Sequence, residues 1–302
     1  MEKLNFFSHK QYATKFYVVT ENYAPNKSRT IGVFYSRERM MTIDAGTGAC
    51  GDIRKYIEDF LTQETFVGTQ FGTMCVCTSG VPENVGGAGY FDEAYIDGAD
   101  LAMAQANLSD AHKASVIAKH SGNNPDLAAY CPAFYVDDSK VQFMDYMSPE
   151  LLRTPDSFDH FHLGGVHLEG LKMPGVTPGS LAILVFGLDL PRYAFTGESL
   201  NFGCTNLARM DRKTLETYRA SLQNLFDHTT ADTAFFGSDS PEPFGQDVLE
   251  DVMRAVDDIL AGNTYGDIPT QMVFHGEVSP DDIRLHYVNG RGVAYNRTRL
   301  AQ

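Results

Sequence analysis

Hydrophobic residues recur at two spacings along the first third of the chain, and these spacings predict strands and a helix. Runs rich in apolar and β-branched residues predict strands at 15–20, 30–35, 39–44 and 72–78. Between the last two runs, four apolar positions within 51–61 recur at helical spacing, so we predict a helix there. Strands interrupted by a helix in this order predict a sheet with helices packed on its face.

The last half of the chain repeats this alternation of short β-rich runs and longer helical segments. Strands are predicted at 161–163, 166–171, 181–186 and 193–196. Helical spacing of apolar residues predicts two long helices, 212–226 and 247–261. The alternating run 283–297 predicts a closing strand pair that turns at Asn289-Gly290. The chain therefore has two β-rich halves, each with helices.

Residues 92–159 lie between these halves and show less regular spacing. An Ala-rich stretch, 99–118, predicts a helix, and turn-forming residues follow at 121–125. We predict a single domain, 1–302, with a cap inserted at 92–159. The cap is rich in aromatic and Met residues, and Tyr135 is our candidate there for contact with a small apolar or aromatic ligand. Packing into a hydrophobic core would explain the same residues.

Composition and charge narrow the classes of partner. The formal net charge is −15, and an acidic surface repels phosphate, which argues against nucleic acids and anionic membranes as partners. We find neither a run of roughly 20 apolar residues nor a secretion signal at the start, so we predict a cytoplasmic protein. The five cysteines are interpreted as reduced. The sequence does not exclude a homo-oligomer.

Four stretches together resemble the metallo-β-lactamase superfamily, in its general hydrolase and glyoxalase-like branch. Met41-Thr42-Ile43-Asp44-Ala45-Gly46 resembles a strand that ends in Asp-x-Gly. Residues 78–87, Thr-Ser-Gly-Val-Pro-Glu-Asn-Val-Gly-Gly, resemble the loop Thr-His-x-His-x-Asp-His-x-Gly-Gly. Residues 173–180 resemble the loop Thr-Pro-Gly-His-Thr-Pro-Gly-Ser, and 195–200 resemble the turn Phe-Thr-Gly-Asp-Ser-Leu. A weaker match, 236–238, replaces Pro-Gly-His.

This resemblance covers nearly the whole chain, and its motifs occur in the family's order. It implies an α/β protein built as a four-layer αβ/βα sandwich, with the site along the shared edge of the two halves. In the family, seven side chains at this edge bind two metal ions. In this sequence all seven positions carry other residues: Ser79, Val81, Glu83, Asn84, Val176, Glu198 and Ser238.

These replacements change the chemistry of the implied site. Zinc prefers imidazole and thiolate ligands, and a hydrolytic zinc site needs three such ligands and an open position for water. Valine has no lone pair to offer, and neutral hydroxyl and amide oxygens are poor zinc ligands. We therefore predict no metal and no other cofactor. The motif glycines and prolines remain, which suggests that the backbone frame of the site is kept.

The altered residues suggest three functions. The first is metal-independent acid/base chemistry on a small molecule, of isomerase, lyase or hydrolase type, with Glu83 and Glu198 as the central pair and no metal charge beside them. Here the candidate catalytic residues are Glu83, Glu198, Ser79, Asn84 and Ser238. The second is a non-catalytic protein that binds a small ligand or a partner. The third is a metal-dependent hydrolase with atypical oxygen ligands. Whether the chain is an enzyme at all stays open.

Further residues are candidates for ligand contact. Val81 and Val176 should fill space between facing loops of the cleft. His160 and His162 lie two apart on a predicted strand, so they share a face, and they precede the second β-rich half. They are candidates for the mouth of the cleft, although a surface or packing role explains them as well. With Tyr135, these residues complete the predicted ligand-binding set.

Overall fold

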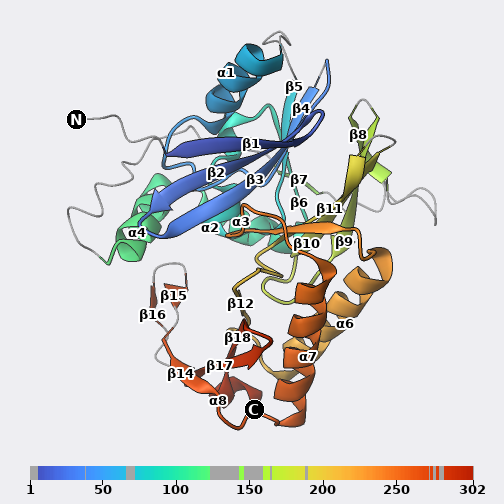
Figure 1. Cartoon of the computed structure of the whole chain (residues 1–302). Helices are drawn as coiled ribbons and strands as arrows, with labels where there is room; N and C mark the ends of the chain where they lie inside the picture. Colours follow the sequence, from blue (N-terminus) through green and yellow to red (C-terminus); the bar gives the residue numbers. More distant parts are fainter. Residues whose placement is uncertain are drawn as a thin grey trace.

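The computed structural model describes most of the chain, and the fold below rests on that part. The described residues are 6–37, 39–65, 72–122, 143–145, 159–163, 165–187, 190–271, 273–274, 277–278 and 282–301. In Figure 1 the strands of the first half, in blue and cyan, lie above the long helices of the second half, in orange. None of the described helices is long and apolar enough to cross a membrane.

The first half contains a seven-stranded sheet whose strands follow the sequence order. Its strands are β1 (Phe7–Ala13), β2 (Phe16–Ala24), β3 (Lys27–Tyr35), β4 (Arg39–Ile43), β5 (Gly72–Val76), β6 (Glu93–Ile96) and β7 (Phe143–Asp145). The pairs from β1 to β4 are antiparallel, and those from β4 to β7 are parallel. The helical elements of this half are α1 (Ile53–Thr65), α2 (Pro82–Val85), η1 (Ala88–Tyr90), η2 (Gly98–Asp100), α3 (Leu101–Asn107) and α4 (Asp110–His120).

The second half contains a five-stranded sheet in the order β13-β11-β10-β9-β8. Its strands are β8 (Asp159–Leu163), β9 (Val166–Lys172), β10 (Leu181–Gly187), β11 (Leu190–Gly197) and β13 (Ala234–Gly237). Two long helices, α6 (Arg212–His228) and α7 (Gln246–Ala261), pack on it. A smaller sheet joins β12 (Cys204–Asn206), β18 (Arg291–Asn296), β17 (Ile283–Val288) and β14 (Ile268–Thr270). The remaining elements are the pair β15 (Val273–Phe274) and β16 (Glu277–Val278), and α8 (Arg297–Leu300).

Alternation along the strands creates three stacked cores. In β3, Ile31 and Val33 face the helices of the first half, whereas Phe34 faces the second sheet. The core between the two sheets is aromatic: Phe16 stacks on Phe34 at 4.5 Å between ring centroids and meets Phe195 edge-on at 5.9 Å. The layers are therefore helix, sheet, sheet and helix, which confirms the predicted four-layer sandwich.

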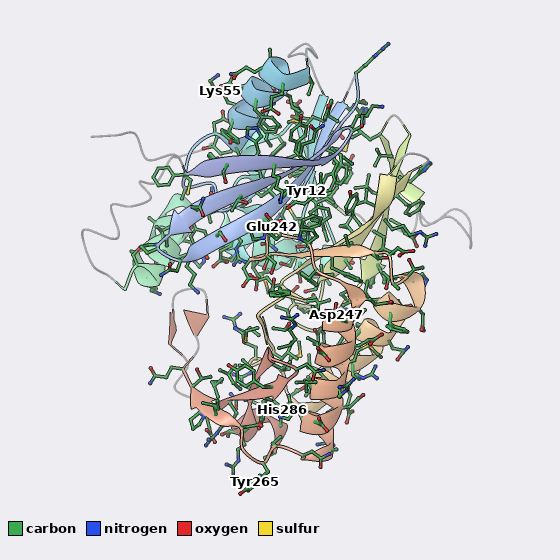
Figure 2. All side chains as sticks on the ribbon, in the orientation of Figure 1. Tyr12, Lys55, Glu242, Asp247, Tyr265 and His286 are labelled. Atoms are coloured by element: carbon green, nitrogen blue, oxygen red, sulfur yellow. The ribbon has the colours of Figure 1, made fainter. Side chains whose placement is uncertain are left out.

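Polar contacts also join the two halves outside this core. The Tyr12 hydroxyl of β1 donates to the Glu242 carboxylate at 2.9 Å, and Lys10 Nζ lies 2.7 Å from the same carboxylate. Glu242 follows β13 in the second half, and Figure 2 shows Tyr12 beside it. The first strand is thus attached to the second half at its surface.

The predicted cap, 92–159, is partly integrated into the first sheet. Strands β6 and β7 fall within it and pair in parallel with their neighbours. The helix predicted at 99–118 is interrupted, because Ser109 acts as an N-cap: its hydroxyl accepts from the His112 amide at 3.2 Å and starts α4 anew. The closing strand pair is β17–β18, with Asn289 and Gly290 both at positive φ in its turn.

Candidate functional site

The hairpin β2–β3 places one arginine at the edge where the two halves meet. Asn26 forms its turn with φ 59°, a left-handed conformation that Asn tolerates better than most residues. Arg29 lies three residues further on, directly opposite Glu21 in the strand register. Its guanidinium lies over the Tyr23 ring, 5.9 Å from the centroid, and the Arg29 side chain is only 11% exposed. The hairpin therefore delivers a largely buried cation.

This cation meets the two carboxylates that the sequence placed at metal-ligand positions. Arg29 Nη2 lies 2.8 Å from Glu198 Oε1 and 4.0 Å from Glu83 Oε1. Although burial opposes the charged form, the surrounding Tyr23, Glu198, Glu83 and Asp239 raise the pKa of Arg29. The sequence predicted no metal charge beside the two carboxylates and gave no sign of another cation. An arginine supplies a positive charge there, because β3 folds against both motif loops.

Backbone geometry explains why the motif glycines are retained around Glu83. A Cβ atom on Gly86 would lie 2.0 Å from the Thr47 carbonyl oxygen, and one on Gly48 would lie 2.1 Å from the Gly86 carbonyl oxygen. The loop before α1 and the turn after α2 therefore lie so close together that neither of these two positions has room for a side chain. Glu83 itself lies in the first turn of α2, which begins at Pro82.

A second close approach fixes Glu198. It follows Gly197, which ends β11 with φ 53° and whose added Cβ would lie 2.3 Å from Thr78 Oγ1. The Ser238 amide donates to the Gly197 carbonyl at 2.8 Å, and the Ser238 carbonyl accepts from the Thr30 amide at 2.8 Å. Glu198, Ser238 and the start of β3 are thus held together by backbone contacts.

These residues line a cleft of about 450 Å³. Five of the seven altered ligand positions contribute to its walls: Val81, Glu83, Val176, Glu198 and Ser238. The two valines come from loops of different halves. Other lining residues include Arg29, Tyr23, Lys27, Asn201, Cys204, Asn206, Leu207, Arg209, Met210, Asp239 and Gln271.

The two remaining altered positions, Ser79 and Asn84, lie buried beside the cleft wall. The Asn84 amide nitrogen donates to Ser79 Oγ at 3.0 Å and to Thr78 Oγ1 at 3.1 Å. Ser79 and Asn84 are 2% and 1% exposed, and neither belongs to the described lining of the cleft. Five of the predicted residues therefore line the cleft. Ser79 and Asn84 instead lie behind its wall and bind each other.

Asp44 holds the start of the motif loop 78–87 through hydrogen bonds. Its carboxylate accepts from the Thr78 amide at 2.7 Å and from the Thr78 hydroxyl at 2.9 Å. Burial, opposed by these hydrogen bonds and by Arg29, raises the pKa of Asp44 to about 7. Asp44 thus orders the adjacent loop, and it loses its proton only as the pH approaches neutrality.

A buried aspartate connects the loops of the two halves. Asp100 is fully buried and accepts from the Gly80 amide and the Gly179 amide, each at 2.8 Å, and from the Thr177 hydroxyl at 2.5 Å. A Cβ on Gly179 would lie 2.7 Å from the Asp100 carboxyl carbon. Val81 follows Gly80 and Val176 precedes Thr177, so Asp100 fixes the two valine-bearing walls relative to each other.

Cys204 is the thiol in the described lining, and its surroundings disfavour the thiolate. Burial, together with the nearby Asp239, raises the pKa of Cys204 to about 11. The neutral thiol is a weak nucleophile, because the thiolate is the reactive form. Nucleophilic catalysis by this cysteine is therefore not supported.

The residues present do not fit a catalytic zinc ion. Arg29 already pairs with Glu198, and a guanidinium within 4.0 Å of both carboxylates leaves the three groups with one net negative charge, which suits a monovalent group but not a zinc dication. Val81 and Val176 provide no ligand atom. Within the described part of the chain, no three His, Cys, Asp or Glu side chains are grouped so that they could hold a metal ion. The chemistry of this cleft is therefore derived without one.

Three predicted ligand-contact residues remain unplaced. The backbone of His160 and His162 belongs to β8, at the edge of the second sheet, and His162 pairs with His167. Their side chains, and all of Tyr135, lie outside the described residues.

The sequence analysis did not name Arg29 and Tyr23 as site residues. The only sequence feature that could have indicated them is a charged and an aromatic residue on either side of a turn between two apolar strands.

Comparison with known proteins identifies the fold. No protein-family model matches the chain, and no curated protein matches it. Solved structures do match, at low sequence identity. A metallo-beta-lactamase from Pontibacter korlensis is 14% identical, with 83% of this chain and 99% of that chain covered at a TM-score of 0.53. The metallo-beta-lactamase FIM-1 from Pseudomonas aeruginosa, in its mono-zinc form, is 13% identical, with 85% and 96% covered at 0.53. One from Erythrobacter litoralis is 14% identical, with 85% and 98% covered at 0.51.

Proposed function

Starting from a chain that has the metallo-β-lactamase fold, we propose that its cleft binds a small polar molecule without a metal ion. The observation that carries this proposal is the guanidinium of Arg29, 2.8 Å from Glu198 and 4.0 Å from Glu83. Both acids stand where the family resemblance places metal ligands. Arg29 therefore supplies a fixed positive charge where the resemblance would place metal ions.

The dimensions and lining of the cleft support a small-molecule ligand. Its volume of about 450 Å³ lies in the range of small-molecule sites. Apolar side chains, among them Val81, Leu207 and Met210, alternate with amide, hydroxyl and charged groups. Such a mixture excludes water from part of a ligand and fixes its orientation through a few polar contacts.

Acid/base turnover is the second candidate, and a difference between the two glutamates favours it. The Glu198 side chain is 22% exposed, whereas that of Glu83 is 3% exposed. Both line the cleft, so Glu198 is the carboxylate better placed to accept a proton from a bound molecule. In this arrangement Arg29 would hold Glu198 in position and stabilise negative charge that develops on the bound molecule.

The metal-dependent alternative with oxygen ligands is less well supported. Calcium takes six to eight oxygen ligands, and magnesium demands a near-octahedral set. Here the two cleft glutamates share a guanidinium, and Asn84 is buried and does not belong to the described lining of the cleft. Arg29 would have to leave the glutamates before they could bind a divalent cation.

Elemental analysis combined with a ligand search tests the proposal. We expect purified protein to carry well under one equivalent of zinc, and a chelator to leave its denaturation midpoint unchanged. A fragment library screened by NMR should yield small polar binders that shift Val81, Val176 and Arg29 resonances, and Arg29→Gln should change the affinity of these binders. Exposed Arg212, which contacts Glu216 on α6, provides the matched control, Arg212→Gln. Stoichiometric zinc in the cleft, or no binder there at all, would overturn the proposal.

A further inference from the structure

The buried and the exposed parts of the cleft carry charges of opposite sign, and this distribution indicates the class of ligand. Resting on the function proposed above, we infer that the cleft takes a zwitterionic small molecule of the amino-carboxylate type. Its ammonium group lies inward against Glu83 and Glu198, and its carboxylate lies outward between Lys27 and Arg209.

The buried part of the cleft, here called the floor, contains Arg29, Glu83 and Glu198. Their side chains are 11%, 3% and 22% exposed. One guanidinium and two carboxylates leave the floor with one formal negative charge. Glu198 Oε1 lies 2.8 Å from Arg29 Nη2, and Glu83 Oε1 lies beyond hydrogen-bond distance from that nitrogen, at 4.0 Å. A primary ammonium group, with three donors, can donate to both carboxylates at once.

The exposed part of the lining, here called the rim, has the opposite balance. Among the described residues, its charged members are Lys27, Arg209 and Asp239, and all three are exposed. Two cations and one anion leave the described part of the rim with one formal positive charge. Lys27 comes from the β2–β3 hairpin and Arg209 from the segment after β12, so the cations approach from different halves. A ligand carboxylate at the mouth can contact either cation or both.

The field of the whole protein favours the same class. The chain carries a net charge of −15, which repels a molecule that bears only negative charge. A zwitterion has no net charge to be repelled, yet its dipole matches the negative floor and positive rim. A purely cationic molecule would be attracted to the surface generally, but it would leave the cationic rim without a partner.

The uncharged wall fits the linker between two such groups. Val81, Val176, Leu207 and Met210 line the same cleft as the charged residues. Apolar side chains suit a short methylene chain, because burying methylene groups away from water is favourable. An amino acid whose charges are separated by a few methylenes therefore matches the cleft better than a compact polar molecule does.

A set of three matched probes tests the inference: 4-aminobutyrate, butylamine and butyrate. Binding is followed by NMR through the resonances of the lining residues, at low and high salt. We expect 4-aminobutyrate to bind at least about tenfold more tightly than either single-charge probe, since roughly 1.4 kcal/mol of added charge pairing corresponds to that factor. Glu198→Gln should weaken 4-aminobutyrate and butylamine but not butyrate. Arg209→Met should weaken 4-aminobutyrate and butyrate but not butylamine.

Exposed charges far from the cleft give the matched controls. Glu216→Gln and Lys55→Met remove charges whose side chains are 57% and 70% exposed, on α6 and α1, and should leave all three affinities unchanged. If all probes bind alike, or if Glu216→Gln acts as strongly as Glu198→Gln, the inference is overturned. If neutral or purely anionic fragments bind the cleft while 4-aminobutyrate does not, the ligand class is overturned although the proposed function stands. If no small molecule reaches the cleft, both fail.

Discussion

Arg29 Nη2 lies 2.8 Å from Glu198 Oε1, so a strand of the first half and a turn of the second half share an ion pair within the cleft. Tyr23 lies beneath the guanidinium, and burial, only partly offset by Arg29, raises the pKa of that tyrosine. The phenol is therefore neutral, and Arg29 interacts with its ring and with the glutamates. This pair connects the fold of the site to its chemistry.

Removing Arg29 should destabilise the fold through its carboxylate partners. Arg29→Met leaves Glu83 and Glu198 near each other without a counter-charge, and breaking a buried ion pair from one side costs about 3 kcal/mol. Chemical denaturation should show this loss, and Arg29→Met/Glu198→Gln should recover part of it. As a control, Lys10→Met removes an exposed partner of Glu242 and should leave the midpoint nearly unchanged. Equal effects of the two single variants would contradict the account.

The same guanidinium should also control access of cations. In Arg29→Ala the two glutamate carboxylates lose their cation, and we expect a divalent ion to take its place. Mn²⁺ or Zn²⁺ should then raise the denaturation midpoint of Arg29→Ala but not that of the wild-type protein. Arg29→Ala/Glu198→Gln should lose the effect. If Arg29→Ala gains no stability from either ion, Arg29 does not act as a substitute for metal charge.

Restoring histidine at the two valines should destabilise the protein without creating a metal site. Val81 is 1% exposed and Val176 is partly exposed. An imidazole buried without full hydrogen-bond partners costs about 1–3 kcal/mol, so Val81→His should cost more than Val176→His. Denaturation midpoints check the order, with Val81→Leu as a control that keeps the side chain apolar. An unchanged or raised midpoint for Val81→His would contradict the packing role of Val81.

The sequence contained enough information for the layers of the fold but less for the site. Strand and helix periods predicted the two β-rich halves, and the resemblance of the motifs to a known family implied the sandwich; glycines such as Gly86 and Gly197 are part of those motifs because close backbone approaches admit few other residues. Glu83 and Glu198, which belong to those motifs, line one cleft. They say nothing about residues outside the motifs.

Arg29 shows why the remainder was not predictable. A single arginine near a hairpin turn has no periodic signal, and its pairing with Glu198 exists only after the two halves pack. Likewise, Ser79 and Asn84 occupy motif positions, yet the Asn84 amide donates a hydrogen bond to the Ser79 hydroxyl behind the cleft wall. The motif predicted that these two residues lie near the cleft. The direction of their side chains depends on contacts with Thr78, which Asp44 holds in place.

Asp44 should make the stability of the protein depend on pH. Burial raises the pKa of Asp44 from 3.8 to about 7 in the folded protein. Between about pH 4 and pH 7 the folded state therefore keeps a proton that the unfolded chain has released. Because the folded state binds more protons in this window, stability falls as pH rises through it. Below pH 4 both states are protonated, and above pH 7 both are ionised, so the contribution is constant outside the window.

Asp44→Asn isolates this contribution. Asn tolerates the left-handed backbone of this position, where φ is 63°, and its side-chain oxygen can still accept from the Thr78 amide. Since each pKa unit corresponds to about 1.4 kcal/mol, the stability of Asp44→Asn relative to wild type should rise by about 4 kcal/mol from pH 4 to pH 7. Urea titrations at several pH values measure this, and Asp59→Asn on exposed α1 is the control. A difference that stays constant with pH would show that Asp44 is ionised throughout, in which case its hydrogen bonds from Thr78 and the charge of Arg29 outweigh burial.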